Sequence, residues 1–192
     1  RSLGRRVLDW RTAAGCWLAL RLVGVILLAG TLYPYVKGDV TYLYAIWANA
    51  LHHGLLPWRH NFFIEYPPGV LVFLALPGAS VTYEVEFVVL ALLADAVIAV
   101  ALWRKRPSGL GFWLWALVPV FLGPVMWVRF DIFVAAALVG FVLFLERARW
   151  RLAGLCVAAA TLLKLWPLVL VAAVWPLVGA KHARRVMAWA IG

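Results

Sequence analysis

Long runs of apolar residues follow one another from Gly15 to Gly179, separated only by short polar breaks. A helix needs about 20 mostly apolar residues to cross a bilayer core, and the longer runs reach this length. The pattern therefore predicts an all-α, polytopic membrane protein, with a further span beginning near Met187. The expected spans lie near residues 15–36, 84–103, 110–127, 132–146, 152–163 and 168–179.

Between the first two runs, residues 37–83 are polar and aromatic, which predicts a large loop instead of another span. Tyr42, Ile46 and Ala50 recur at helical spacing, so a helix is expected early in this loop. The apolar stretch from Pro68 to Gly78 is bounded by prolines and is too short to cross the bilayer. We expect both segments to be interfacial helices that belong to one helical bundle.

Composition and charge agree with a membrane location. The 192 residues are 66% hydrophobic and carry a formal net charge of +10. In a soluble protein this charge would suggest a nucleic acid partner, but here the basic residues gather in the breaks between apolar runs, and no nucleic acid is expected. Thirteen of the 18 Lys and Arg residues form four clusters: Arg1, Arg5, Arg6 and Arg11; Arg104, Lys105 and Arg106; Arg147, Arg149 and Arg151; Lys181, Arg184 and Arg185.

The positive-inside rule places these four clusters and the N-terminus on the cytoplasmic side of the plasma membrane. A multi-pass chain threaded in this way brings ionisable residues from distant parts of the sequence to the outer side. These residues are Asp39, Glu65, Arg129, Asp131 and Lys164. Charges at such positions are costly and mark functional sites by default. The sequence therefore predicts chemistry at the outer lipid–water boundary.

The two acidic residues of the loop each have two interpretations. Asp39 stands where a helix is expected to begin, so it either caps that helix or serves as a general base beside a water-accessible cavity. Glu65 precedes Tyr66 and two prolines, which favour an extended backbone. It is either a solvated interfacial carboxylate or a group that orients a substrate or holds a metal. His60 and the neighbouring histidines show no metal-ligand spacing.

The later charged residues also have alternatives. Arg129 and Asp131 form either a local ion pair that closes a turn or a grip for a phosphate, since a guanidinium matches phosphate geometry. Lys164 lies within an apolar run, where it either extends its ammonium to the interface or serves the site. Arg21 and Asp95 fall inside expected spans, where they either pair with each other or face a cavity.

The string from Gly38-Asp39 through Trp47-Ala48-Asn49 to Glu65-Tyr66-Pro67-Pro68-Gly69 resembles the first outer loop of GT-C glycosyltransferases. Most similar is glycosyltransferase family 87, the bacterial α-mannosyltransferases that use polyprenyl-phosphomannose. The Arg129-Phe130-Asp131 turn and Lys164-Leu165-Trp166-Pro167 match that pattern in order and side. Family members are about twice as long, so we expect the chain to be an N-terminal fragment.

The resemblance implies a reaction at the outer leaflet. The donor would be a polyprenyl-phosphate sugar, with mannose as the sugar that the family resemblance implies, and the acceptor a glycolipid or glycan hydroxyl. Asp39 would be the catalytic base of an inverting displacement, and Arg129 and Lys164 would bind the donor phosphate. Residues expected to bind or orient substrate are Glu65, Tyr66, Asp131, His60 and Arg59. No metal and no other cofactor is expected.

Three points stay open on the sequence alone. Asp39 and Glu65 can exchange roles, and another lipid-linked sugar, such as an arabinose donor, fits equally well. A multi-pass transporter or flippase for a lipid-linked or anionic substrate is the alternative function. Transporters carry internal repeats and polar groups near mid-membrane. This chain instead gathers its charges at one side, which favours the enzyme, and a purely structural subunit would leave those charges without a role.

Overall fold

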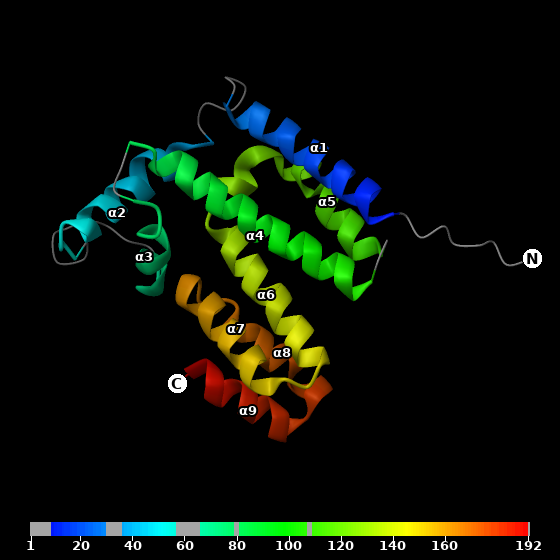
Figure 1. Cartoon of the computed structure of the whole chain (residues 1–192). Helices are drawn as coiled ribbons and strands as arrows, with labels where there is room; N and C mark the ends of the chain where they lie inside the picture. Colours follow the sequence, from blue (N-terminus) through cyan, green and yellow to red (C-terminus); the bar gives the residue numbers. More distant parts are fainter. Residues whose placement is uncertain (1–8, 30–35, 57–65, 79–80, 107–108, 192) are drawn as a thin grey trace, which may run out of the picture.

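The computed structural model describes residues 9–29, 36–56, 66–78, 81–106 and 109–191, and these residues form helices joined by short turns (Figure 1). The fold is all-α, as the sequence pattern predicts. The helices are α1 (Trp10–Ala29), η1 (Asp39–Tyr44), α2 (Ala45–His52), α3 (Gly69–Leu74), α4 (Tyr83–Lys105), α5 (Leu110–Leu122), η3 (Gly123–Trp127), α6 (Asp131–Glu146), α7 (Trp150–Leu163), α8 (Leu168–Val178) and α9 (Ala180–Ile191).

Three helical segments are long and apolar enough to cross a membrane: Trp10–Ala29, Tyr83–Lys105 and Leu110–Trp127. The last is formed by α5 and η3 together, because the α-helix ends at Gly123, whose φ is +61°. The same helices expose many large apolar side chains, such as Leu22 and Val97. Exposed apolar surface of this kind is suited to lipid. The shorter α6, α7 and α8 coincide with the remaining expected spans, whose crossing stays a prediction.

A buried ion pair joins α1, α4 and α5. Arg21 Nε donates to Asp95 Oδ2 at 2.7 Å, and Arg21 Nη2 donates to Oδ1 at 2.9 Å. The indole of Trp115 donates to the same Oδ1 at 2.6 Å, and Arg21 Nη1 donates to the Ala116 carbonyl at 2.5 Å. The side chains are 4% and 0% exposed. Of the two sequence interpretations for Arg21 and Asp95, the structure has the mutual pair.

The second half of the chain packs as α6 on α4, α7 on α6, and α9 across α7 and α8 (Figure 1). Gly154 allows the closest approach: a Cβ there would lie 2.6 Å from the Val186 carbonyl oxygen of α9. Helix α9 begins at Ala180, directly after Gly179, whereas the sequence pattern predicts a span starting near Met187. The last basic cluster therefore lies on a helix and not in a loop.

The loop elements η1, α2 and α3 gather at one end of the long helices, beside the first turn of α4 (Figure 1). The expected helix over Pro68–Gly78 is shorter than predicted, since α3 covers only Gly69–Leu74. Gly69 packs on α7, where a Cβ would lie 2.7 Å from the Leu162 carbonyl oxygen. The largest apolar core lies beneath these elements and includes Tyr44, Trp47, Phe87 and Phe130.

The opposite end of α4 carries basic residues. Arg104 and Lys105 form its last turn, and Figure 1 shows α5 beginning beside this end, away from η1, α2 and α3. Lys105 forms an ion pair with Glu146 at the end of α6, which fastens α4 to α6. The two ends of the bundle thus differ: one carries a cluster of mostly basic residues, and the other carries the ion pairs described next.

Candidate active site

Four charged side chains from three segments of the chain lie near the end of the bundle that η1, α2 and α3 cover. Asp39 is the first residue of η1, and Arg129 lies in the bend between η3 and α6. Asp131 is the first residue of α6, and Lys164 follows the last turn of α7. The segments are brought together by packing of η1 on α4, α4 on α6, and α6 on α7.

The first pair joins Arg129 to Asp39: Nη1 of the guanidinium donates to Oδ2 of the carboxylate. Their side chains are 41% and 28% exposed, so the pair borders open space instead of the core. The N-cap position of η1 is Gly38, so Asp39 stands one residue inside the helix and not at the expected cap. The roles of Asp39 as a base and of Arg129 as a phosphate ligand stay predictions. Arg129 reaches across to η1 and does not pair with Asp131.

The second pair joins Lys164 to Asp131, with Nζ donating to Oδ1. The ammonium also lies 5.2 Å from the centroid of the Phe130 ring, a cation–π contact. The side chain of Lys164 is therefore directed at the start of α6 and does not simply extend into water. A third pair stands beside these two, because Lys37 Nζ lies 2.7 Å from Glu84 Oε1. It ties the start of η1 to the first turn of α4.

Phe130 is the buried residue between the two ion pairs. It is fully buried between Arg129 and Asp131 in the chain. The ring of Tyr66 meets it edge to face at 4.7 Å, and the ring of Tyr44 lies 5.8 Å away. Aromatic contacts of this kind add to the free energy of burial. Because the buried Phe130 lies between Arg129 and Asp131, it positions their backbones, while their charged groups stay accessible.

Tyr44 is a site residue that the sequence analysis does not single out. Its side chain is 0% exposed, and its hydroxyl finds no hydrogen-bond partner among the described residues. Burial raises the pKa of this phenol well above its ordinary value, neighbouring Tyr66 and Asp39 raise it further, and Arg129 acts in the opposite direction. The phenol therefore stays protonated. The helical stripe of Tyr42, Ile46 and Ala50 gives no signal for it, since Tyr44 lies off that stripe.

A groove of about 300 Å³ opens beside the charged cluster, between α5, η3 and α6. Arg129 and Asp131 stand at its polar edge. The remaining lining is apolar: Trp115, Val118, Leu122, Val125, Met126, Ile132 and Ala135. A polar edge that continues into an apolar channel suits a molecule with a charged head and a hydrocarbon tail.

Several predicted site residues lie outside the described residues: Glu65, His60 and Arg59. Tyr66 is described and lies against Phe130 and Trp47. Within the described part of the chain, no three His, Cys, Asp or Glu side chains are placed to hold a metal ion together. The roles expected for Glu65, His60 and Arg59, and the possible exchange of roles between Asp39 and Glu65, stay predictions.

These features define an all-helical membrane protein with paired charges and an apolar groove at one end of its helices. The sequence model of glycosyltransferase family 87 matches residues 63–192, more than half of the chain. The chain belongs to glycosyltransferase family 87 and is a membrane glycosyltransferase. Tyr66, Arg129, Asp131 and Lys164 lie within the matched span, whereas Asp39 precedes it. Searches of curated proteins and of solved structures give no match.

Proposed function

We propose that this protein transfers a sugar, mannose, from a polyprenyl-phosphate donor to a hydroxyl of a glycolipid or glycan, with inversion of configuration. The observation that carries the proposal is the pair of neighbouring, partly exposed ion pairs, Asp39–Arg129 and Asp131–Lys164, at the edge of an apolar groove. Two cations near one another suit a phosphate, and the groove suits the lipid attached to it.

Binding of the donor is an exchange of partners. Arg129 donates to Asp39 through Nη1, which leaves further donors of its planar fork for a phosphate oxygen. Lys164 contributes an ammonium group, which Asp131 positions by accepting its hydrogen bond. The polyprenyl chain extends along the groove past Leu122 and Ile132. In this arrangement the anomeric carbon lies above the charged cluster, on the side away from the lipid.

Exchange of partners also releases the base. Once Arg129 turns to the phosphate, the Asp39 carboxylate is available to an acceptor hydroxyl. The acceptor oxygen forms a bond to the anomeric carbon as its proton passes to Asp39, and the bond from that carbon to the phosphate oxygen breaks. The leaving polyprenyl phosphate takes the electron pair and gains negative charge, which Arg129 and Lys164 stabilise. A single displacement inverts the anomeric centre.

The remaining residues have supporting roles. Tyr66 packs against Phe130 and so borders the cluster, where it orients the sugar. Asp131 positions Lys164. Glu65, Arg59 and His60 complete the acceptor side of the pocket or, for Glu65, serve as the base in place of Asp39. The reaction requires no metal, because the leaving group is a monophosphate that two basic side chains can neutralise.

The reaction takes place at the outer face of the plasma membrane. The basic turns of α4 and of the α6–α7 connection favour the cytoplasm, and the charged cluster lies toward the opposite ends of these helices. This orientation gives the lipid-linked donor access from the outer leaflet. It is tested by cysteine accessibility from either side of sealed vesicles, at Asp39→Cys against Arg104→Cys.

The direct test is transfer of labelled mannose from polyprenyl-phosphomannose in membranes that contain the protein. Asp39→Asn is expected to lower transfer by about 10²–10⁴-fold, because the general base is lost. Glu84→Gln is the matched control, since it removes a carboxylate from another ion pair at the same end and should keep transfer near the wild-type level.

The outcomes separate the parts of the proposal. Full transfer by Asp39→Asn removes Asp39 as the base, and Glu65→Gln is then the variant to measure. Transfer by the wild type from another polyprenyl-phosphate sugar, and not from the mannose donor, corrects the sugar alone. Transfer from no polyprenyl-phosphate donor, with the protein folded in its membrane, contradicts the proposed donor class.

A further inference from the structure

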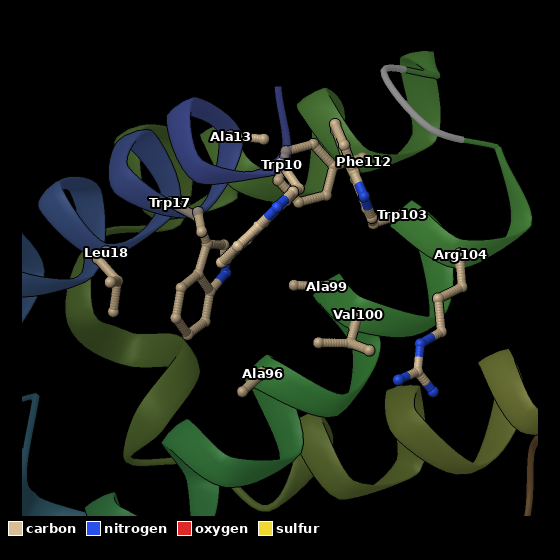
Figure 2. A pocket seen from close by; sticks show the side chains of 11 residues that line it. Trp10, Ala13, Trp17, Leu18, Ala96, Ala99, Val100, Trp103, Arg104 and Phe112 are labelled. Atoms are coloured by element: carbon tan, nitrogen blue, oxygen red, sulfur yellow. The ribbon is translucent and has the colours of Figure 1, made fainter. Parts of the chain in front are cut away.

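A second groove lies at the other end of the bundle, between α1, α4 and α5, and has a volume of about 250 Å³ (Figure 2). Its floor is made of small side chains, including Ala13, Ala96 and Ala99. Its walls are large rings, Trp10, Trp17, Trp103 and Phe112. Small residues facing large ones leave a channel that the protein itself does not fill. It is far along α4 from the charged cluster and takes no part in the proposed transfer.

The chemistry of this groove is apolar except at one edge. Figure 2 shows Arg104 and the Trp17 indole on opposite sides of the opening, with Ala99 and Val100 between them. Arg104 is exposed, and among the described residues it has no ion-pair partner. None of the described residues that line the groove is acidic. From Ala96 to Arg104 the channel follows about 12 Å of helix, the length of several methylene groups.

Tryptophan favours the boundary between hydrocarbon and headgroups, and three tryptophans line this groove. Trp17 carries a further signal, because its indole nitrogen is buried without a hydrogen-bond partner among the described residues. An unmet donor of this kind is costly, and a shift of the ring toward the groove would bring it to an ester oxygen of a lipid. The Arg21 guanidinium lies 5.0 Å from the same ring, so the groove wall rests on the buried ion pair.

We infer that this groove binds one anionic phospholipid, with an acyl chain along Ala96–Val100 and the phosphate beside Arg104. The argument rests on charge complementarity: an unpaired guanidinium stands at the mouth of an acid-free apolar channel on helices suited to lipid. Arg11 and Arg106, exposed near the same helix ends, add to the positive field. A phospholipid has both parts, a chain for the channel and a phosphodiester for Arg104.

The test is native mass spectrometry of the detergent-purified chain, titrated with dioleoyl phosphatidylglycerol and, in parallel, with dioleoyl phosphatidylcholine. One phosphatidylglycerol is expected to be retained about fivefold better than phosphatidylcholine. Arg104→Gln is expected to remove this preference. Arg185→Gln on α9 is the matched control, because it removes an exposed basic residue outside the groove and should keep the preference.

A second pair of variants tests the channel. Val100→Trp fills the groove and is expected to lower retention of both lipids, whereas Val97→Trp adds the same ring at an exposed position of α4 outside the groove and should not. Thermal unfolding of each variant shows that it is folded. Equal retention of both lipids by the wild type overturns the inference. So does a mass of two chains that Val100→Trp reduces to one, because a second copy then occupies the groove.

Discussion

Two ion pairs in this protein use the same chemical groups in opposite ways. Arg21 and Asp95 lie inside candidate spans, almost wholly buried, and their polar atoms meet each other, the Trp115 indole and a backbone carbonyl. Arg129 and Asp39 lie at the end of the bundle, partly exposed, and are joined by a hydrogen bond from Nη1 to Oδ2. The Arg21–Asp95 pair is buried and its polar atoms are already hydrogen-bonded, so it is not available to a ligand. The exposed pair can exchange partners, and this difference distinguishes a structural charge from a chemical one.

The largest expected effect comes from breaking the buried pair. Asp95→Asn leaves the Arg21 guanidinium buried without its counter-charge, so the free energy of unfolding should fall by about 3–5 kcal/mol. Thermal unfolding in detergent measures it. The double variant Arg21→Met with Asp95→Leu should recover most of this loss, because two apolar side chains replace both charges. A double variant as unstable as Asp95→Asn would mean that the pair itself, and not the orphaned charge, carries the stability.

Breaking the exposed pair should affect activity strongly and stability little. Arg129→Gln is expected to lower sugar transfer by about 10²–10³-fold, the usual cost of losing one donor to a developing anion. Its unfolding should change by no more than about 1 kcal/mol, since exposed ion pairs contribute little. Transfer assays and unfolding curves on the same membranes check both. Wild-type transfer by Arg129→Gln, or a loss of stability that matches that of Asp95→Asn, would erase the contrast between the two pairs.

The close packing of α1 next to the buried pair gives an intermediate effect. A Cβ at Gly24 would lie 2.3 Å from the Trp127 ring, so Gly24→Ala must push α1 outward and should cost about 1–3 kcal/mol. Gly15→Ala on the same helix is the matched control, because a Cβ there meets nothing within 4 Å. If the two variants unfold alike, the approach of α1 does not set the geometry of the pair.

Tyr44→Phe should have the smallest effect, and in opposite directions for stability and activity. Removing a buried hydroxyl without a partner should leave stability unchanged or raise it by about 1 kcal/mol. Transfer should fall by no more than about fivefold, since the buried hydroxyl acts on the site only through its electrostatic interaction with Asp39 and Arg129. Steady-state kinetics measure the fall. Unchanged kinetics together with a stability gain would make Tyr44 a packing residue only.

The apolar pattern predicts the fold well because helix length and lipid exposure depend on local composition. It places α4, observed at Tyr83–Lys105, within a few residues of the expected span 84–103. It overestimates α3, which begins next to Pro68 as expected but ends at Leu74, where the Tyr83 hydroxyl donates to the Leu74 carbonyl. Helix α9 is also beyond local pattern, since its position depends on the close approach at Gly154.

The candidate site shows where sequence reasoning stops. Charge and topology place Asp39, Arg129, Asp131 and Lys164 on one side of the membrane, and in the structure these residues form two ion pairs, while their roles stay a prediction. The partners are another matter: a local pair of Arg129 with Asp131 is the nearest choice in sequence, yet each pairs with a residue from a distant segment. Phe130 explains this, because its burial turns the two flanking side chains toward different neighbours. Tyr44 is invisible from sequence, as only the fold reveals its missing partner.

The four charges of the cluster have a consequence for selectivity. Two acids cancel two bases, so the resting cluster has no net charge of its own and exerts little long-range pull on anions. Abundant phospholipids, which offer charge but no sugar, are therefore poor competitors there, although the groove at Arg104 should attract them. In the proposed function, a donor binds only if its contacts are strong enough to displace the carboxylate partners of Arg129 and Lys164. Bulk phospholipid therefore does not occupy the site.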